Sequence, residues 1–167
     1  PTFRLQTGAG ETVSLSDFRG QKVVLYFYPK DDTPGCTKEA CGFRDTRSQF
    51  GEVHAAIFGV SRDSVASHQR FADAFNLPFP LLSDQDARVC KAYGVYKQKS
   101  MYGRTYWGIE RTTFIVDEAG RIARVFPKVK VDGHINEVLE ALRGSSPVPA
   151  PTLVRINVAT PRRRGLQ

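Results

Sequence analysis

Short apolar runs alternate with stretches of mixed polar and apolar residues along most of the chain. The clearest run, residues 22–28, is Lys-Val-Val-Leu-Tyr-Phe-Tyr followed by Pro29, which is typical of a buried central strand. Two later runs flank Glu118-Ala119-Gly120, the pattern of an antiparallel hairpin. In all, the pattern predicts strands at residues 2–5, 22–28, 53–60, 81–82, 112–117 and 121–126.

Helical periodicity fills the segments between these strands. The predicted helices span residues 34–50, 64–75, 86–93 and 136–142. Ser61 or Asp63 is a suitable cap for the second helix, and Gly144 ends the last one. Strands that alternate with helices, followed by a late hairpin, indicate an α/β fold with a central mixed sheet flanked by helices.

The chain length of 167 residues, 41% of them hydrophobic, fits one domain with a real core. We assign residues 1–144 to this domain, because a Ser- and Pro-rich stretch follows Gly144. Residues 145–167 are predicted to form a tail of unknown role, although residues 153–158 could instead pair as a strand. The chain starts at Pro1 without a Met, so we expect a fragment or a processed form that has lost its first residues.

The net charge of +7 is concentrated in the tail, where four arginines lie among residues 145–167 without an acid. The remaining 20 basic and 17 acidic residues are scattered and leave only +3. We therefore expect no nucleic-acid partner. No run of eighteen apolar residues occurs, so we expect no membrane partner either.

The cysteine count of three excludes a fully paired disulfide framework within one chain. A domain of this size does not need disulfides for stability, so we expect a reducing compartment in which thiols do chemistry. The predicted location is the cytoplasm, and an organelle if a targeting segment has been removed.

Cys36 lies at a predicted helix start that directly follows the central strand. Thr33 is a good N-cap and Pro34 suits the first helical position, which places Cys36 in the first turn. The unpaired N–H groups and the helix dipole favour an anion there, so a thiolate should be stabilised. A buried structural cysteine is the alternative.

Ionisation alone cannot make a thiol a fast peroxidase. An ordinary cysteine is about 3% thiolate at neutral pH, so full ionisation gains at most roughly thirtyfold. Groups that polarise the O–O bond are also needed, namely a fixed cation and a hydroxyl. Thr33 supplies the hydroxyl, and its oxygen could also accept the backbone N–H of Cys36.

Cys41 follows Cys36 by five residues on the same predicted helix. Ideal helix geometry separates their Cα atoms by roughly 8.6 Å, whereas a disulfide tolerates about 7 Å. A bridge between them therefore requires local unwinding. A sulfenic acid on Cys36 can condense with a nearby thiol, which makes Cys41 a natural partner. Cys90 is favoured as a buried structural thiol.

The run from Phe27 to Cys41 resembles the active-site signature of peroxiredoxins, with Pro-x-x-x-Thr-x-x-Cys at Pro29, Thr33 and Cys36. The Cys-x-x-x-x-Cys spacing resembles the subfamily called peroxiredoxin Q or bacterioferritin comigratory protein. The segment from Glu110 to Asp117 resembles the family segment that brings in an arginine. The likeness covers roughly residues 1–143.

This resemblance implies a thioredoxin-like fold and reduction of hydrogen peroxide or organic hydroperoxides in antioxidant defence. It makes Cys36 the peroxidatic and Cys41 the resolving cysteine. It also implies that Thr33 and Arg111 bind the peroxide oxygens and that Pro29 shields the pocket. No metal or organic cofactor is implied. The implied partners are the hydroperoxide and a thioredoxin-type reductant, and the implied state is a monomer.

Three other functions remain as alternatives. A thioredoxin-type disulfide oxidoreductase would share the fold but normally has Cys-x-x-Cys. A peroxidase that uses only Cys36 would need an external thiol. A metal-binding module is disfavoured because the cysteines and histidines form no Cys-x-x-Cys or His-x-x-x-His pair. The three histidines are expected at the surface. The candidate ligands are Cys36, Cys41, Cys90, His54, His68 and His134.

Overall fold

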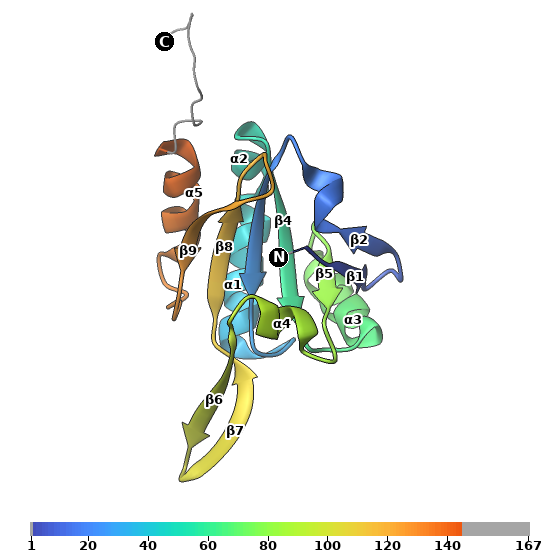
Figure 1. The fold of residues 1–167 in the computed structure, drawn as a ribbon, viewed down its shortest axis with the longest axis vertical. Helices are drawn as coiled ribbons and strands as arrows, with labels where there is room; N and C mark the ends of the chain where they lie inside the picture. Colours follow the sequence, from blue (N-terminus) through green and yellow to red (C-terminus); the bar gives the residue numbers. More distant parts are fainter. Residues whose placement is uncertain (1, 145–167) are drawn as a thin grey trace, which may run out of the picture.

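A computed structural model describes residues 2–144 of the chain, so the predicted tail at 145–167 lies outside the described residues. Strands and helices alternate through most of this range (Figure 1). The strands are β1 Arg4–Thr7, β2 Thr12–Ser14, β3 Lys22–Phe27, β4 Ala55–Ser61, β5 Leu81–Ser83, β6 Tyr96–Met101, β7 Arg104–Ile109, β8 Thr112–Val116 and β9 Ile122–Phe126. The helices are the 3₁₀ turn η1 Leu15–Phe18, α1 Pro34–Asp45, α2 Arg47–Glu52, α3 Val65–Phe75, α4 Arg88–Ala92 and α5 His134–Gly144.

Seven strands form one sheet in the order β2-β1-β5-β4-β3-β8-β9. The central strand β3 runs parallel to β4 and antiparallel to β8. The predicted mixed α/β sheet is therefore confirmed. Among the described strands, β6 and β7 stand outside this sheet and pair with each other.

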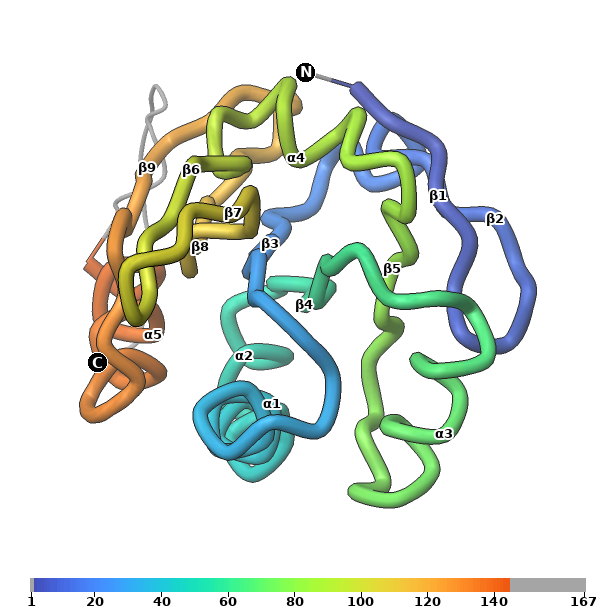
Figure 2. The backbone as a smooth tube through the Cα atoms, turned by 90° about the horizontal axis from the view of Figure 1, so that it is seen from below, coloured from blue at the N-terminus to red at the C-terminus, as the bar shows by residue number. Residues whose placement is uncertain are grey.

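Two apolar layers cover the two faces of the sheet, because successive side chains of a strand point to opposite faces. Figure 2 shows α1 and α3 on one side of the sheet and α4 on the other. The first layer packs β3 against α1, α3 and α5, and the second packs β3 against η1 and α4. The side chains of β3 divide accordingly, with Val24 and Tyr26 in the first layer and Val23, Leu25 and Phe27 in the second.

The predicted helix at residues 34–50 is in fact two helices that meet at Thr46. The Thr46 hydroxyl donates to the Gly42 carbonyl at 2.9 Å, which is a local bond that competes with helix continuation. The cap of α3 was also predicted wrongly. Ser64 caps this helix by accepting the Ser67 N–H at 3.1 Å.

The β6–β7 hairpin carries no strand in the sequence prediction. Most residues of both strands are exposed, so the hairpin has no alternation of apolar and polar positions that would predict a strand. None of the helices in the described range is long and apolar enough to span a membrane.

Candidate active site

Cys36 and Arg111 meet at one end of the central strands. Strand β3 ends at Phe27, and its loop leads into α1, which carries Cys36 in the first turn as predicted. Phe27 pairs with Thr112, so Arg111, which directly precedes β8, lies beside the same loop. The strand register therefore brings together two residues that are 75 positions apart in the chain.

The Arg111 guanidinium contacts two groups on α1. Its Nη2 donates to the Cys36 Sγ at 3.3 Å, and its Nη1 donates to the Glu39 Oε1 at 2.6 Å. A Cβ at Gly35 would lie 3.2 Å from Nη2, so the missing side chain leaves room for the guanidinium beside the helix start. The planar fork of arginine suits this double contact, and the compact ammonium of a lysine could not reproduce it.

Burial dominates the electrostatics of this cluster. Cys36 is 1% exposed and Glu39 is 0% exposed. Burial raises the pKa of Glu39 from 4.5 to about 7, although the positive charge of Arg111 opposes this shift. The Glu39 Oε2 has no hydrogen-bond partner among the described residues, which fits a carboxyl group that readily takes up a proton.

Arg111 stays protonated throughout. Burial lowers the pKa of Arg111, but the negative charges at Glu39 and Cys36 outweigh burial and the net shift is upward. A permanent cation thus lies at hydrogen-bond distance from the sulfur. Arg111 is therefore a fixed cation of the kind that the sequence analysis requires for polarising the O–O bond of a peroxide.

Thr33 is the N-cap of α1, as expected, but its side chain makes no cap hydrogen bond. Its hydroxyl instead donates to the Lys30 carbonyl at 2.9 Å, so the expected bond from the Cys36 N–H to Thr33 is wrong. Because the hydroxyl donates its proton to the Lys30 carbonyl, the oxygen lone pairs of Thr33 remain able to accept from another donor. Pro29 is exposed in the loop between β3 and α1.

Cys41 lies on the same unbroken helix as Cys36 and is half-buried. All three cysteines of the chain are free thiols. Cys90 belongs to the apolar layer on the opposite face of the sheet from Cys36. Burial and the neighbouring Asp84 carboxylate raise the pKa of Cys90 well above its ordinary value, which agrees with an inert structural thiol.

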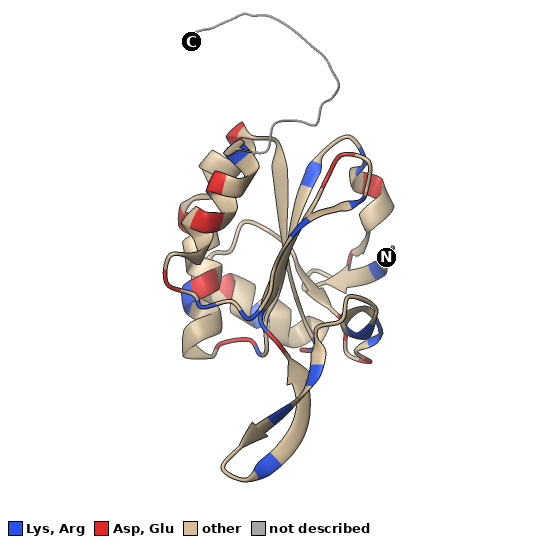
Figure 3. Cartoon of the chain, turned by 60° about the vertical axis from the view of Figure 1, so that its left-hand side comes forward, with Lys and Arg blue, Asp and Glu red and all other residues tan. Residues whose placement is uncertain are grey.

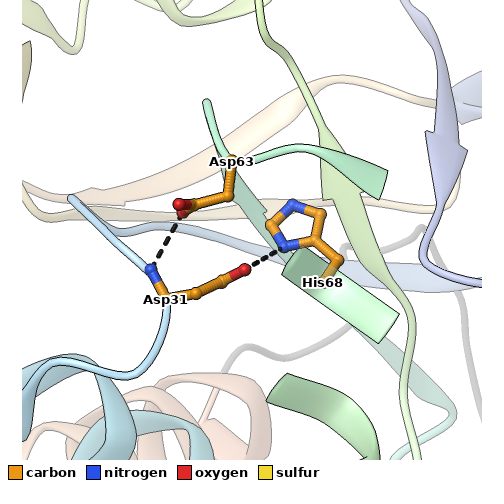
Figure 4. Close-up of side chains that lie close together, drawn as sticks. All are labelled: Asp31, Asp63 and His68. Carbon is orange, nitrogen blue, oxygen red and sulfur yellow. Dashed lines mark hydrogen bonds and ion pairs between the residues drawn. The ribbon is translucent and has the colours of Figure 1, made fainter. Parts of the chain in front are cut away.

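A second buried network, which no sequence pattern predicts, fixes the loop that leads to Cys36. The Asp31 carboxylate accepts from the Tyr28 hydroxyl at 2.6 Å and from the Ser67 hydroxyl at 2.8 Å. The Asp31 N–H donates to the Asp63 carboxylate at 2.9 Å. Figure 4 shows Asp31 between Asp63 and His68, which ties the loop to the end of β4 and to α3.

His68 completes this network from inside the core. Its Nδ1 lies 2.8 Å from the Asp31 carboxylate, and its Nε2 donates to the Leu82 carbonyl at 3.0 Å. The expectation that all three histidines lie at the surface is therefore wrong for His68 and His134, which are 0% and 2% exposed. Both side chains are hydrogen-bonded, which is how buried polar groups are tolerated.

Asp31, Asp63 and His68 are also the only group of potential metal ligands that lies close together among residues 2–144, within 4.8 Å. Each of these ligand atoms already takes part in a hydrogen bond with a neighbouring protein group. The arrangement is therefore that of an anchor for the loop.

Comparison with known proteins supports the same chemistry. The sequence profile described as the AhpC/TSA family matches residues 1–125. A Coxiella burnetii peroxiredoxin of the Bcp type is 58% identical over 142 residues, which are 85% of this chain and 94% of that protein. Peroxiredoxin Bcp of Bacillus subtilis is 49% identical over 146 residues, covering 87% and 93%.

Solved structures agree. The bacterioferritin comigratory protein of Xanthomonas campestris, studied for its alkyl peroxide reduction activity, matches with a TM-score of 0.81 at 43% identity. The match covers 84% of this chain and 90% of the Xanthomonas chain. This match confirms the thioredoxin-like fold.

Replacing Glu39 by Gln should change how stability depends on pH. The folded-state pKa of about 7 lies above the unfolded value of 4.5, so wild type loses stability as the pH rises through this window. The shift corresponds to roughly 3 kcal/mol. We expect the free energy of unfolding of Glu39→Gln, relative to that of wild type, to be higher at pH 8 than at pH 5 when both are measured by denaturant unfolding.

The exposed Glu52 provides a matched control, because Glu52→Gln should shift stability equally at both pH values. Parallel profiles for wild type and Glu39→Gln would show that the buried carboxyl group does not titrate in this range.

Replacing Arg111 by Ala should slow the reaction of Cys36 with hydrogen peroxide by more than the roughly thirtyfold that thiol ionisation can supply. Rapid-quench measurement of thiol loss gives the second-order rate constant. Arg111→Lys keeps the charge but not the double contact, and it should recover only part of the rate. A rate within a few fold of wild type in Arg111→Ala would refute the proposed O–O polarisation.

Proposed function

The chain belongs to the AhpC/TSA family and is a peroxiredoxin, a thiol-dependent peroxidase, and from this premise we propose that Cys36 attacks the peroxide and Cys41 resolves the product. The observation that carries the assignment is the contact between the Arg111 guanidinium and the Cys36 sulfur in the first turn of α1. Cys41 and Cys90 have no comparable contact with a cation among the described residues.

The first step transfers one oxygen atom. The Cys36 thiolate attacks the terminal oxygen of the hydroperoxide, an S–O bond forms, and the O–O bond breaks. Cys36 becomes a sulfenic acid, and the other oxygen leaves as an alkoxide or hydroxide that takes up a proton. Arg111 stabilises the negative charge that develops on the oxygens. The Thr33 hydroxyl, which donates to the Lys30 carbonyl, can contact the peroxide through its free oxygen lone pairs.

The second step forms a disulfide and releases water. The Cys41 thiol attacks the Cys36 sulfenic acid, the S–O bond breaks, and water leaves. Both cysteines lie on α1, whose ideal geometry places their Cα atoms roughly 8.6 Å apart. The beginning of α1 must therefore unwind, since a disulfide tolerates only about 7 Å.

Two anchors define where this unwinding occurs. Asp31 holds the chain before α1, so the loop up to Asp31 can stay in place. Glu39 lies between the two cysteines and must release Arg111. Protonation of Glu39 weakens its bond to Arg111, and a pKa of about 7 makes this protonation available at neutral pH.

A thiol reductant then returns the enzyme to its starting state, and we infer that it is a dithiol protein of the thioredoxin type. Because both reacting cysteines belong to one chain, a monomer suffices for the whole cycle. Three free thiols are suited to a reducing compartment such as the cytoplasm. We propose that Pro29, which is exposed in the loop before α1, shields the site from solvent.

Three single substitutions test these roles. Cys36→Ser should abolish peroxide consumption, because it removes the nucleophile. Cys41→Ser should leave the first oxidation fast but stop turnover with a dithiol-protein reductant. The control Cys90→Ala should retain both activities, since Cys90 lies on the other face of the sheet. Steady-state and single-turnover assays with hydrogen peroxide separate these outcomes, and an active Cys36→Ser protein would end the assignment.

A further inference from the structure

The β6–β7 hairpin projects from the body of the molecule at the end of the sheet where α1 begins (Figure 1). Six large hydrophobic side chains are exposed among residues 2–144, and four of them belong to this hairpin: Met101, Tyr102, Tyr106 and Trp107. Tyr102 at its tip is 97% exposed. A cluster of exposed apolar side chains on a projecting ribbon indicates a contact surface for a partner.

The hairpin is also purely cationic. Residues 96–109 contain Lys97, Lys99 and Arg104 and no acidic residue. Figure 3 shows these basic positions along the hairpin, which carries no acidic position. Such a surface attracts a partner of negative charge.

The strand register places all three cations on one face. Lys99 is paired with Tyr106, and Met101 is paired with Arg104. Because side chains two residues apart share a face, Lys97, Lys99 and Met101 lie on the same side as Arg104 and Tyr106. We call these five residues the cationic face.

The cationic face borders the peroxide site. The Lys97 Nζ lies 3.8 Å from the carboxylate of Glu110, the residue directly before Arg111, so the base of this face lies next to the site. Burial and nearby Arg111 lower the pKa of Lys99, while Glu110 and Cys36 act in the opposite direction. The opposite face of the hairpin turns toward α4. There the Tyr96 ring stacks on Trp107, and its hydroxyl accepts from Arg62 at 3.0 Å.

We propose that the cationic face is the docking surface for the dithiol protein that reduces the Cys36–Cys41 disulfide, and that this reductant presents acidic side chains beside its attacking thiol. The proposal rests on the proposed function, because it requires that disulfide to form.

The composition and position of the face favour a protein as its occupant. Tyr, Met and Arg are enriched at the centres of protein interfaces, and all three occur here. The charged residues run along one side of the ribbon, from Lys97 beside Glu110 at its base to Arg104 next to its tip. A partner seated on this face would lie at the end of the sheet where α1 begins, and α1 carries both cysteines.

The chemistry at this position is two thiol–disulfide exchanges. A reductant thiolate attacks the sulfur of Cys41, the more exposed of the two cysteines, and Cys36 leaves as a thiolate. The second thiol of the reductant then attacks the mixed disulfide and releases Cys41. Two electrons pass from the dithiol to the disulfide, and the reductant leaves as a disulfide.

The test compares two reductants on isolated oxidised protein. The double variant Lys97→Gln/Arg104→Gln should be reduced about fivefold to tenfold more slowly than wild type by a purified bacterial thioredoxin, with a weaker dependence on salt. Its reduction by dithiothreitol and its oxidation by hydrogen peroxide should be unchanged. The matched control Arg19→Gln/Arg121→Gln removes two exposed cations near the opposite end of β3 and should behave as wild type.

Each other result overturns the proposal in a distinguishable way. Reduction of the double variant by thioredoxin at the wild-type rate and salt dependence would refute docking and leave the peroxidase cycle intact. An unchanged rate together with lost binding to anionic phospholipid vesicles would identify a membrane surface instead. Failure of wild type to form the Cys36–Cys41 disulfide would remove the proposed function, and the docking proposal with it.

Discussion

One guanidinium, shared between a sulfur and a buried carboxyl group, determines how this site is built. Arg111 must reach Cys36 at 3.3 Å and Glu39 at 2.6 Å at the same time, and both lie on α1. This requires α1 to start directly beside the end of β8, which the pairing of β3 with β8 provides. Gly35 before Cys36 gives the guanidinium room, because a Cβ there would lie 3.2 Å from the Arg111 Nη2.

The contact between Arg111 and Cys36 favours the proposed attack on peroxide but opposes the proposed formation of the disulfide. In the proposed cycle, an intact helix start holds the sulfur against Arg111 for the attack on peroxide, whereas the proposed Cys36–Cys41 disulfide would need that helix to unwind. Glu39 is suited to couple the two states, because its burial costs free energy and its Oε2 has no hydrogen-bond partner among residues 2–144. Functional segments that open locally are drawn from the less stable parts of a fold. The Asp31 and His68 network fixes the chain just before α1 and would confine the proposed opening to the helix itself.

Much of this fold was predictable from local signals. The apolar run of β3, the helix start at Thr33 and Pro34, and the placement of Cys36 all follow from neighbouring residues. Arg111 was identified only through the family resemblance, because its role depends on a strand register that no local pattern encodes. Glu39 and His68 were missed for the same reason, since burial converts ordinary polar residues into site components only after the chain has folded. The exposed β6–β7 hairpin was missed because it has no buried face to produce a pattern.

Peptide mapping of the oxidised protein tests the central claim most directly. Wild type is treated with one equivalent of hydrogen peroxide, free thiols are blocked at once, and the linked peptides are identified. The account predicts a Cys36–Cys41 disulfide with Cys90 still free. A sulfenic acid on Cys36 beside a free Cys41 would contradict resolution within the helix, and an unmodified Cys36 would contradict the account as a whole.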